Sequence, residues 1–355
     1  MFGWSKDSRS PIGIDIGTRR IKAMQLDRNG ARIAAVAMMQ RLESSPIPSD
    51  TEVARLVATF ERAGFAGNRI VMAVPPEMLS SDVLELPKSA VQLEQLARME
   101  VARAQRCAPD ALEVGAWELP ATARPGKTTK VMTVAVKHDD VNPLLEAFDQ
   151  HHLDVVALDA RCAVLARAID SGAADDKSIT AILDYGWNAA TLVLLRQGIV
   201  FYERKIVESG LNKLHRELCE RLRVEGDVAD FLLSDEEQGL GADGDVYPEA
   251  RAALLTHMEA LTTEMLASFN YAGQQYDDAS LGRLLMTGGG TITRGFTAHL
   301  ENTLGVQVKV LAPADLLPCR PEHAQLCRSP SMMSALGLAM FPVQKSAEKV
   351  VPNAA

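Results

Sequence analysis

At 355 residues the chain is long enough for roughly two domains with cores of their own, and its 47% hydrophobic and 23% charged residues are ordinary for a globular protein. The formal net charge of −9 argues against broad nucleic-acid binding, which needs a basic face, so we expect no nucleic-acid partner. No stretch reaches about 18 uncharged apolar residues, so we expect no transmembrane segment.

The first strongly patterned stretch is residues 12–26. Its alternating apolar residues predict two short strands around a polar turn. Asp15 could hold a hydrated Mg²⁺, and Gly17 lets the backbone come close to a ligand. Thr18 offers a hydroxyl, and Lys22 could neutralise a phosphate oxygen. Taken alone, the stretch is equally compatible with a plain surface hairpin.

The same pattern recurs half a chain later, in residues 181–195. Asp184 and Gly186 stand two residues apart, as the aspartate and glycine of the first hairpin do, and Asn188 follows in the turn. Thr191 comes seven residues after its aspartate, which is the spacing of Lys22 in the first hairpin. Two such hairpins predict two related α/β lobes that face a shared cleft.

A third turn is rich in glycine. Residues 284–287 read as the end of a strand, and Gly288, Gly289 and Gly290 follow it before a predicted helix. This order favours the close approach of a nucleotide to the backbone.

Together the three stretches resemble the phosphate-1, phosphate-2 and adenosine motifs of the actin/Hsp70/sugar-kinase superfamily. Over nearly the whole length, the chain resembles the PilM family, the actin-like proteins of type IV pilus assembly, which are similar to the division protein FtsA. The resemblance implies an α/β, actin-like (duplicated ribonuclease H-like) two-lobe fold with an inserted subdomain of the 1C type in place of actin's 1B.

The resemblance and the order of the predicted elements divide the chain into four parts and a tail. These are lobe 1 or 1A (11–76, 154–175 and 335–342), subdomain 1C (77–153), lobe 2 or 2A (178–213 and 274–331), subdomain 2B (214–273) and a polar tail (343–355).

The resemblance also implies that ATP and Mg²⁺ lie in the cleft. Mg²⁺ would be held through water by Asp15 and Asp184. The sequence identifies no catalytic residue, and Asp159 is a weak candidate because it opens the predicted helix between the lobes. The implied nucleotide-binding residues are Asp15, Gly17, Thr18, Lys22, Asp184, Gly186, Asn188, Thr191, Gly288, Gly289 and Gly290.

The second hairpin departs from its relatives, which have small and hydroxyl residues around the β- and γ-phosphates. Trp187, Ala189 and Ala190 stand there instead, and each lost hydrogen bond to a charged phosphate forfeits about 1.5–3 kcal/mol. Arg19 and Arg20 could offset part of this loss. We therefore expect nucleotide binding and at most a weak ATPase activity.

In function, the resemblance implies a scaffold that is cytoplasmic and peripheral at the inner face of the inner membrane. Its partners would be the cytoplasmic N-terminal peptide of a PilN-like membrane protein, bound beside subdomain 1C, and other pilus assembly proteins. Three alternatives stay open. They are a sugar- or acetate-kinase type of phosphotransferase, an FtsA-like filament-forming protein, and an actin fold that has lost its nucleotide.

Overall fold

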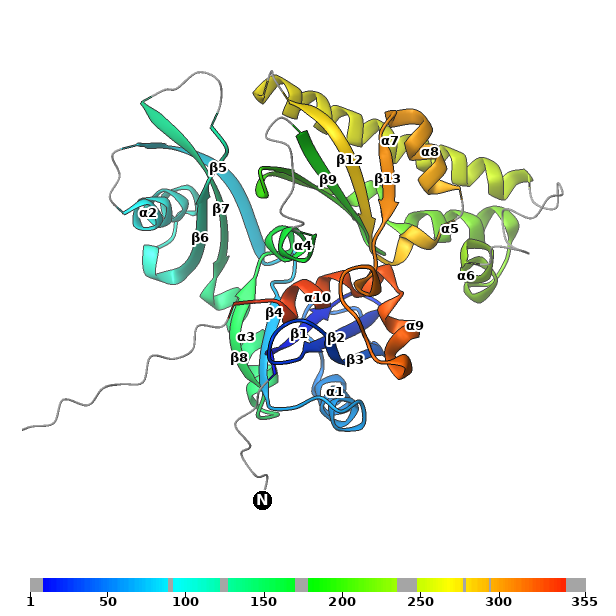
Figure 1. The fold of residues 1–355 in the computed structure, drawn as a ribbon, viewed down its shortest axis with the longest axis horizontal. Coiled ribbons are helices and arrows are strands. Elements are labelled where there is room, and N and C mark those ends of the chain that lie inside the picture. The colour runs from blue at the N-terminus through cyan, green and yellow to red at the C-terminus, as the bar shows by residue number, and fades with distance from the viewer. Residues whose placement is uncertain are drawn as a thin grey trace, which may run out of the picture.

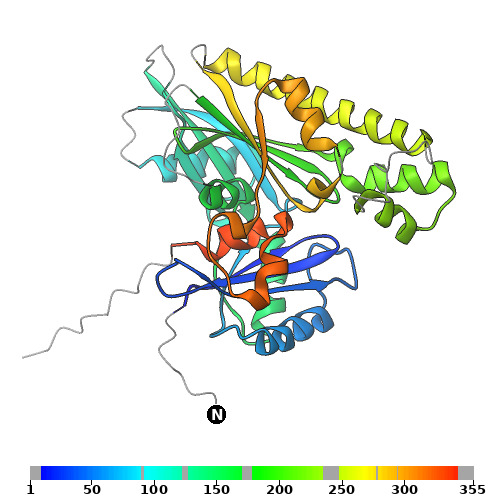
Figure 2. The same ribbon diagram turned by 45° about the vertical axis from the view of Figure 1, so that its right-hand side comes forward.

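The computed structural model describes residues 9–88, 92–121, 127–169, 178–234, 248–276, 279–293 and 295–342. Two lobes lie one above the other, and a smaller sheet lies beside the upper lobe (Figures 1 and 2). The predicted tail, 343–355, falls outside the described residues. Among those residues, no helix is both long and apolar enough to span a bilayer.

Lobe 1 is built on a five-stranded sheet in the order β3-β2-β1-β4-β8. β1 (Ile12–Ile16), β2 (Arg20–Leu26) and β3 (Ile33–Gln40) form an antiparallel meander. β4 (Arg69–Ala73) and β8 (Asp154–Asp159) extend the sheet in parallel. α1 (Asp50–Arg62) and α3 (His138–Asp149) pack on it.

Lobe 2 repeats this sheet, in the order β11-β10-β9-β12-β13. β9 (Ser178–Tyr185), β10 (Ala190–Arg196) and β11 (Ile199–Ile206) are the antiparallel meander. β12 (Ser280–Thr287) and β13 (Gln307–Val310) are the parallel strands. The identical order and directions confirm the predicted duplicated, actin-like α/β fold.

Helices of lobe 2 cover one face of its sheet and extend beyond it (Figure 2). α5 (Leu211–Leu222), α6 (Gly226–Ser234) and the 28-residue α7 (Pro248–Gln275) pack on one another in the predicted 2B region. α8 (Phe296–Leu304) packs against β13, and the short α9 (Ala324–Cys327) lies against β3.

The inserted unit has a three-stranded sheet of its own, β5-β7-β6, with α2 (Leu93–Gln105) packed on it. Its strands are β5 (Leu79–Pro87), β6 (Leu112–Glu118) and β7 (Thr128–Lys137). α3, which falls in the predicted subdomain 77–153, contributes Leu144 and Phe148 to the same buried cluster as Ile12 of lobe 1. The unit also contacts lobe 2, where the Trp117 indole N–H donates to the Val200 carbonyl over 2.7 Å.

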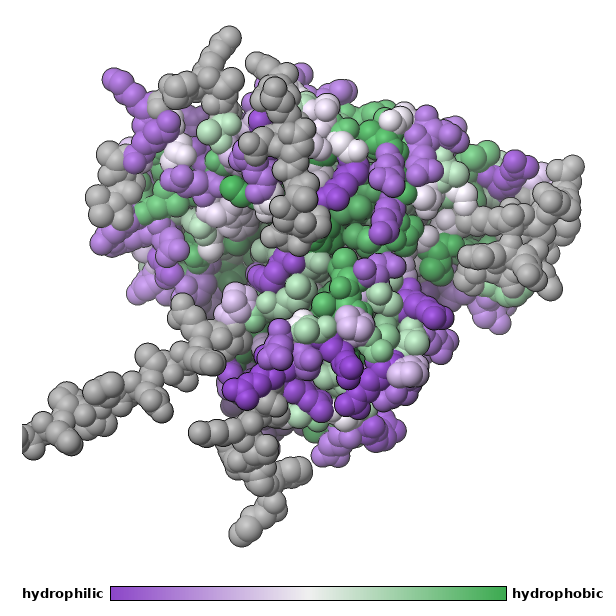
Figure 3. Space-filling model, viewed as in Figure 1, coloured by the Kyte–Doolittle hydropathy of each residue, from purple (hydrophilic) through white to green (hydrophobic). Residues whose placement is uncertain are grey.

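Two helices lie between the two large sheets (Figure 1). They are α4 (Arg161–Ile169) and α10 (Met333–Ala339), which contact each other. Gly337 permits this contact, because a Cβ there would lie 2.2 Å from the Val164 carbonyl oxygen. Figure 3 shows apolar surface gathered in the middle of the molecule, where the lobes meet, above a largely polar lower lobe. The crossing brings the first residue of α4, Arg161, between the two hairpins.

Candidate nucleotide-binding cleft

The strand registers place the two hairpins in equivalent positions. Lys22 of β2 lies opposite Asp15 of β1, and Thr191 of β10 lies opposite Asp184 of β9. Each turn is closed by the N–H of its glycine, from Gly17 to the Arg20 carbonyl and from Gly186 to the Ala189 carbonyl, both over 3.0 Å. These two amides are therefore engaged within their own turns.

A cavity of about 450 Å³ lies between the hairpins, within the range of small-molecule sites. Asp15 lies beside it, fully buried. The basic side chains Arg19, Lys22 and Arg161 also line the cavity. The other ten predicted nucleotide-binding residues all line it, namely Gly17, Thr18, Lys22, Asp184, Gly186, Asn188, Thr191, Gly288, Gly289 and Gly290.

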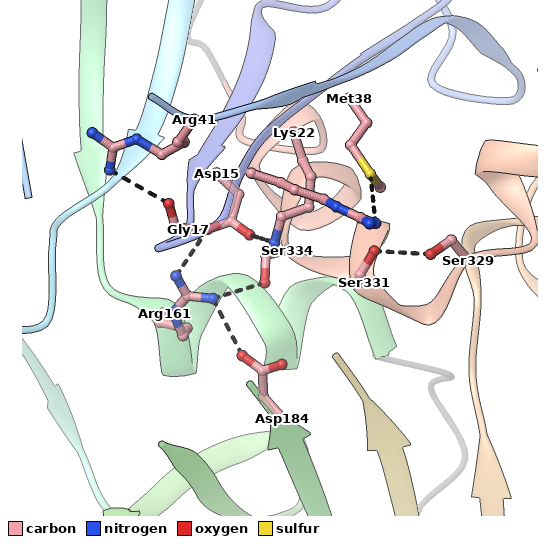
Figure 4. A network of polar contacts seen from close by, with 11 residues as sticks. Asp15, Gly17, Lys22, Met38, Arg41, Arg161, Asp184, Ser329, Ser331 and Ser334 are labelled. Carbon is pink, nitrogen blue, oxygen red and sulfur yellow. Dashed lines mark hydrogen bonds and ion pairs between the residues drawn. The ribbon is translucent and has the colours of Figure 1, made fainter. Parts of the chain in front are cut away.

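Arg161 joins the two aspartates (Figure 4). Its Nη2 donates to Asp15 Oδ1 over 2.8 Å, and its Nη1 donates over 3.2 Å to both Asp184 Oδ2 and Ser334 Oγ. The second oxygen of Asp15 accepts from Lys22 Nζ over 2.5 Å. One guanidinium therefore spans the space between the lobes, at the point where the sequence analysis expected a metal ion.

Asp15 and Arg161 hold each other in their charged forms. Burial alone would raise the pKa of Asp15, but the charges of Arg161 and Lys22 outweigh it and hold the pKa well below its usual range. The charge of Asp15, followed by that of Asp184, raises the pKa of Arg161 above its usual value although burial opposes this. Two carboxylates and two cations thus sit together with no net charge.

This arrangement does not fit the predicted magnesium ion between Asp15 and Asp184. Both oxygens of Asp15 already accept from cationic groups, and Asp184 accepts from Arg161. Hydrated Mg²⁺ is usually held by carboxylates that carry net negative charge. Here Arg161 and Lys22 neutralise that charge.

A second contact bridges the cleft at its mouth. Arg19, in the turn of the first hairpin, makes a bidentate ion pair with Asp230 of α6, at 3.1 and 2.8 Å. The same guanidinium lies 4.2 Å from the ring centroid of Trp187 in the second hairpin. His215 packs edge-on against that indole and pairs with Asp230 over 3.3 Å. The tryptophan thus forms part of a contact between the lobes.

A buried network supports the first turn from behind. The guanidinium of Arg41 pairs with both oxygens of Glu52 and donates to the carbonyls of Ser45, over 2.6 Å, and Gly17, over 3.4 Å. Glu52 also accepts from the Ser49 N–H, which completes a capping box at the start of α1. Arg41 and Ser45 line the cavity, so this network shapes its wall.

The glycine-rich turn fits closely against the second hairpin. Gly288 has a φ of +93°, and a Cβ there would lie 2.5 Å from the Tyr185 carbonyl oxygen. A Cβ on Gly290 would lie 2.5 Å from the Tyr185 ring, whereas Gly289 has open space around it. Two of the glycines are therefore required by packing, and the middle one faces no such restriction.

The comparisons with known proteins agree with this geometry. The family model described as "Type IV pilus assembly protein PilM" matches residues 13–342. The chain belongs to this family. Among solved structures, the fold is similar to that in the PilM-PilN type IV pilus biogenesis complex, with a TM-score of 0.77 and 21% identity over 93% of this chain and 97% of that one. It is also similar to the ethanolamine utilization protein EutJ of Carboxydothermus hydrogenoformans, with a TM-score of 0.54 and 15% identity over 94% and 90%.

Membership of the PilM family favours the pilus-scaffold interpretation of the sequence over the phosphotransferase and the filament-forming protein. The predicted association with type IV pilus assembly is thereby confirmed.

In this PilM-family protein, the predicted catalytic candidate does not line the cavity, and some residues that do line it were not predicted. Asp159 is not among the residues that line the cavity. Its carboxylate instead pairs with Arg167 over 2.6 Å and accepts a hydrogen bond from the Ala160 N–H over 2.8 Å. Arg161, two residues later, was not predicted, although its place at the start of the crossing helix was a signal for it. The cavity-lining Glu203, whose pKa burial raises, was also missed, and no local motif marks it.

Proposed function

We propose that this protein is a nucleotide-binding scaffold of the type IV pilus machinery, located in the cytoplasm at the inner face of the inner membrane. Its partner would be the short cytoplasmic N-terminal segment of a PilN-type membrane protein. The observation that carries this proposal is the family match over residues 13–342. The similarity to a chain of the PilM-PilN complex over 93% of the length supports it.

The peptide would bind beside the inserted subdomain, as the family resemblance implies. This unit forms a contact surface distinct from the cleft, since its strands and α2 contribute none of the cleft residues except Leu79. It is nevertheless tied to lobe 2 through Trp117 and through the Tyr276 hydroxyl, which donates to the Pro120 carbonyl over 3.1 Å. A change in the angle between the lobes would therefore shift the position of this subdomain.

We infer that the cleft binds the phosphates of ATP or ADP between the hairpins, with the adenosine near Gly288–Gly290. Lys22, Arg161 and Arg19 provide cationic N–H donors at the cavity wall, and Thr18, Asn188 and Thr191 provide hydroxyl and amide groups. Bound phosphates would contact both hairpins at once and so favour a closed arrangement of the lobes. In this role the nucleotide acts as a ligand that sets lobe orientation, and rapid turnover is not needed.

The partner assignment is tested by fluorescence anisotropy with a labelled peptide that carries the cytoplasmic N-terminal sequence of the PilN-type protein from the same operon or organism. We expect saturable binding to the full chain, and none of a peptide with the same composition in scrambled order. Equal binding of the two peptides, or of neither, would contradict the proposed partner.

A further inference from the structure

We propose that Arg161 is a built-in cation that takes the position of the divalent metal between the two hairpins, so that nucleotide phosphates bind in this cleft without magnesium. The proposal rests on the nucleotide binding proposed above. It goes beyond it by assigning a role to a residue at the centre of the site and by removing a metal that the fold family implies.

The position of the guanidinium is the first argument. Arg161 is held by acceptors from three separate elements: Asp15 of β1, Asp184 of β9 and Ser334 of α10. A side chain fixed at three points is preorganised, so little conformational entropy remains to be lost when a ligand arrives. It stands at the same junction of two hairpin aspartates that a bridging metal would occupy.

The charge is the second argument. A pair of carboxylates attracts Mg²⁺ when their negative charge is not already neutralised. In this cluster Lys22 and Arg161 balance Asp15 and Asp184, and Asp15 has a cation on each oxygen. A divalent ion would have to displace Arg161 and would leave a guanidinium next to it, in a site where like charges repel strongly.

The donor geometry is the third argument. A guanidinium has five N–H groups in a planar fork that matches phosphate oxygens. Three of these groups in Arg161 account for its contacts with Asp15, Asp184 and Ser334. The described residues provide no acceptor for the other two, and the residue lines the cavity, so both are available to a phosphate.

Calorimetry with ATP tests the inference directly, on the full-length protein in excess magnesium and in excess EDTA. We expect dissociation constants that agree within about threefold. A loss of affinity greater than about tenfold in EDTA would overturn the proposal, because the phosphates would then need the metal. Absence of binding in both buffers would refute the nucleotide binding itself.

A measurement without nucleotide keeps these two failures apart. Mn²⁺ serves as a paramagnetic substitute for Mg²⁺, and electron paramagnetic resonance counts the ions bound by the nucleotide-free chain. We expect the wild type and Asp184→Asn to bind the same number of Mn²⁺ ions, because the wild type has no Mn²⁺ site at Asp184. Such a site in the wild type would overturn the assignment of Arg161, whatever the result with ATP.

The variant Arg161→Ala frees Asp184 and one oxygen of Asp15, whose other oxygen stays paired with Lys22. We therefore expect it to gain one Mn²⁺ site and to bind ATP more tightly with magnesium than with EDTA. Arg204→Ala is the matched control, because Arg204 pairs with Glu264 on α7 and does not line the cavity. It is expected to behave as the wild type in both measurements. If Arg161→Ala does not fold, the two wild-type measurements still decide the question.

Discussion

Replacing Glu52 by glutamine tests the network behind the first turn. The Glu52 side chain is fully buried, and Arg41, with 3% of its side chain exposed, pairs with both of its oxygens. Burial alone would raise the pKa of Glu52. The Arg41 guanidinium and the N–H groups of Leu42 and Ser49 more than reverse that effect, so the pKa falls from 4.5 to about 2.

This difference sets the size of the effect. A pKa of about 2 in the folded protein against 4.5 corresponds to about 3 kcal/mol of stability at neutral pH. Because the folded-state value is the lower one, the contribution is complete above 4.5 and is lost as the pH falls toward 2. Glu52→Gln should therefore lower the free energy of unfolding by about 3 kcal/mol at neutral pH, but by only about 1 kcal/mol near pH 3.

Urea unfolding of wild type and variant at both pH values is the assay. Glu208→Gln is the matched control, since the Glu208 side chain is 84% exposed. We expect it to change stability by less than about 0.5 kcal/mol at either pH. Equal destabilisation by Glu52→Gln at the two pH values would refute the reasoning, because the loss would then not come from the buried charge.

Three further predictions concern the buried ion pairs, the bridge between the lobes and the packing of the two central helices. Asp15→Asn leaves Lys22 and Arg161 without their shared buried counter-charge, so the free energy of unfolding in urea should fall by about 3–5 kcal/mol. A fall of less than about 1 kcal/mol would contradict the account. For the half-exposed pair Arg19–Asp230, a double-mutant cycle with alanine should give a coupling energy of about 0.5–1 kcal/mol, and additive single mutants would rule the bridge out. Gly337→Ala should lower the free energy of unfolding by about 1–3 kcal/mol, because the added methyl group forces α10 away from Val164. Gly273→Ala, where α7 leaves open space, should raise it by about 0.5–1 kcal/mol. A change of the same sign in both variants would argue against the packing explanation.

The duplicated fold was predictable because both hairpins leave a local signature. The alternation of apolar residues and the seven-residue spacing from Asp15 to Lys22, repeated from Asp184 to Thr191, depend only on strand register. The same local signal identified the hairpin residues Gly17, Thr18, Lys22, Asp184, Gly186, Asn188 and Thr191, which line the cavity. The sequence did not indicate that α3 joins the buried cluster of lobe 1, because an amphipathic helix shows that it has an apolar face but not which sheet that face covers.

The contacts at the centre of the site were not predictable from local patterns, although the start of the crossing helix marked the place of Arg161. Arg161 meets Asp15 and Asp184 only because α4 passes between the lobes, and its partners lie 146 and 23 residues away in the chain. The ion pair of Arg19 with Asp230 spans 211 residues in the same way. Trp187 looked like a loss to the site, yet it stacks beneath Arg19 as part of the contact between the lobes. Such contacts follow from tertiary structure, which no short motif encodes.

Binding of ATP to the wild type and to Lys22→Met, measured by calorimetry, tests the central claim that both hairpins close on one set of phosphates. The account predicts one site per chain in the wild type, and about 10- to 100-fold weaker binding in Lys22→Met from the loss of one charged contact. Lys309→Met, on the exposed side of β13, should leave the affinity unchanged. An affinity that is the same in Lys22→Met as in the wild type, or no binding by the wild type, would contradict the claim.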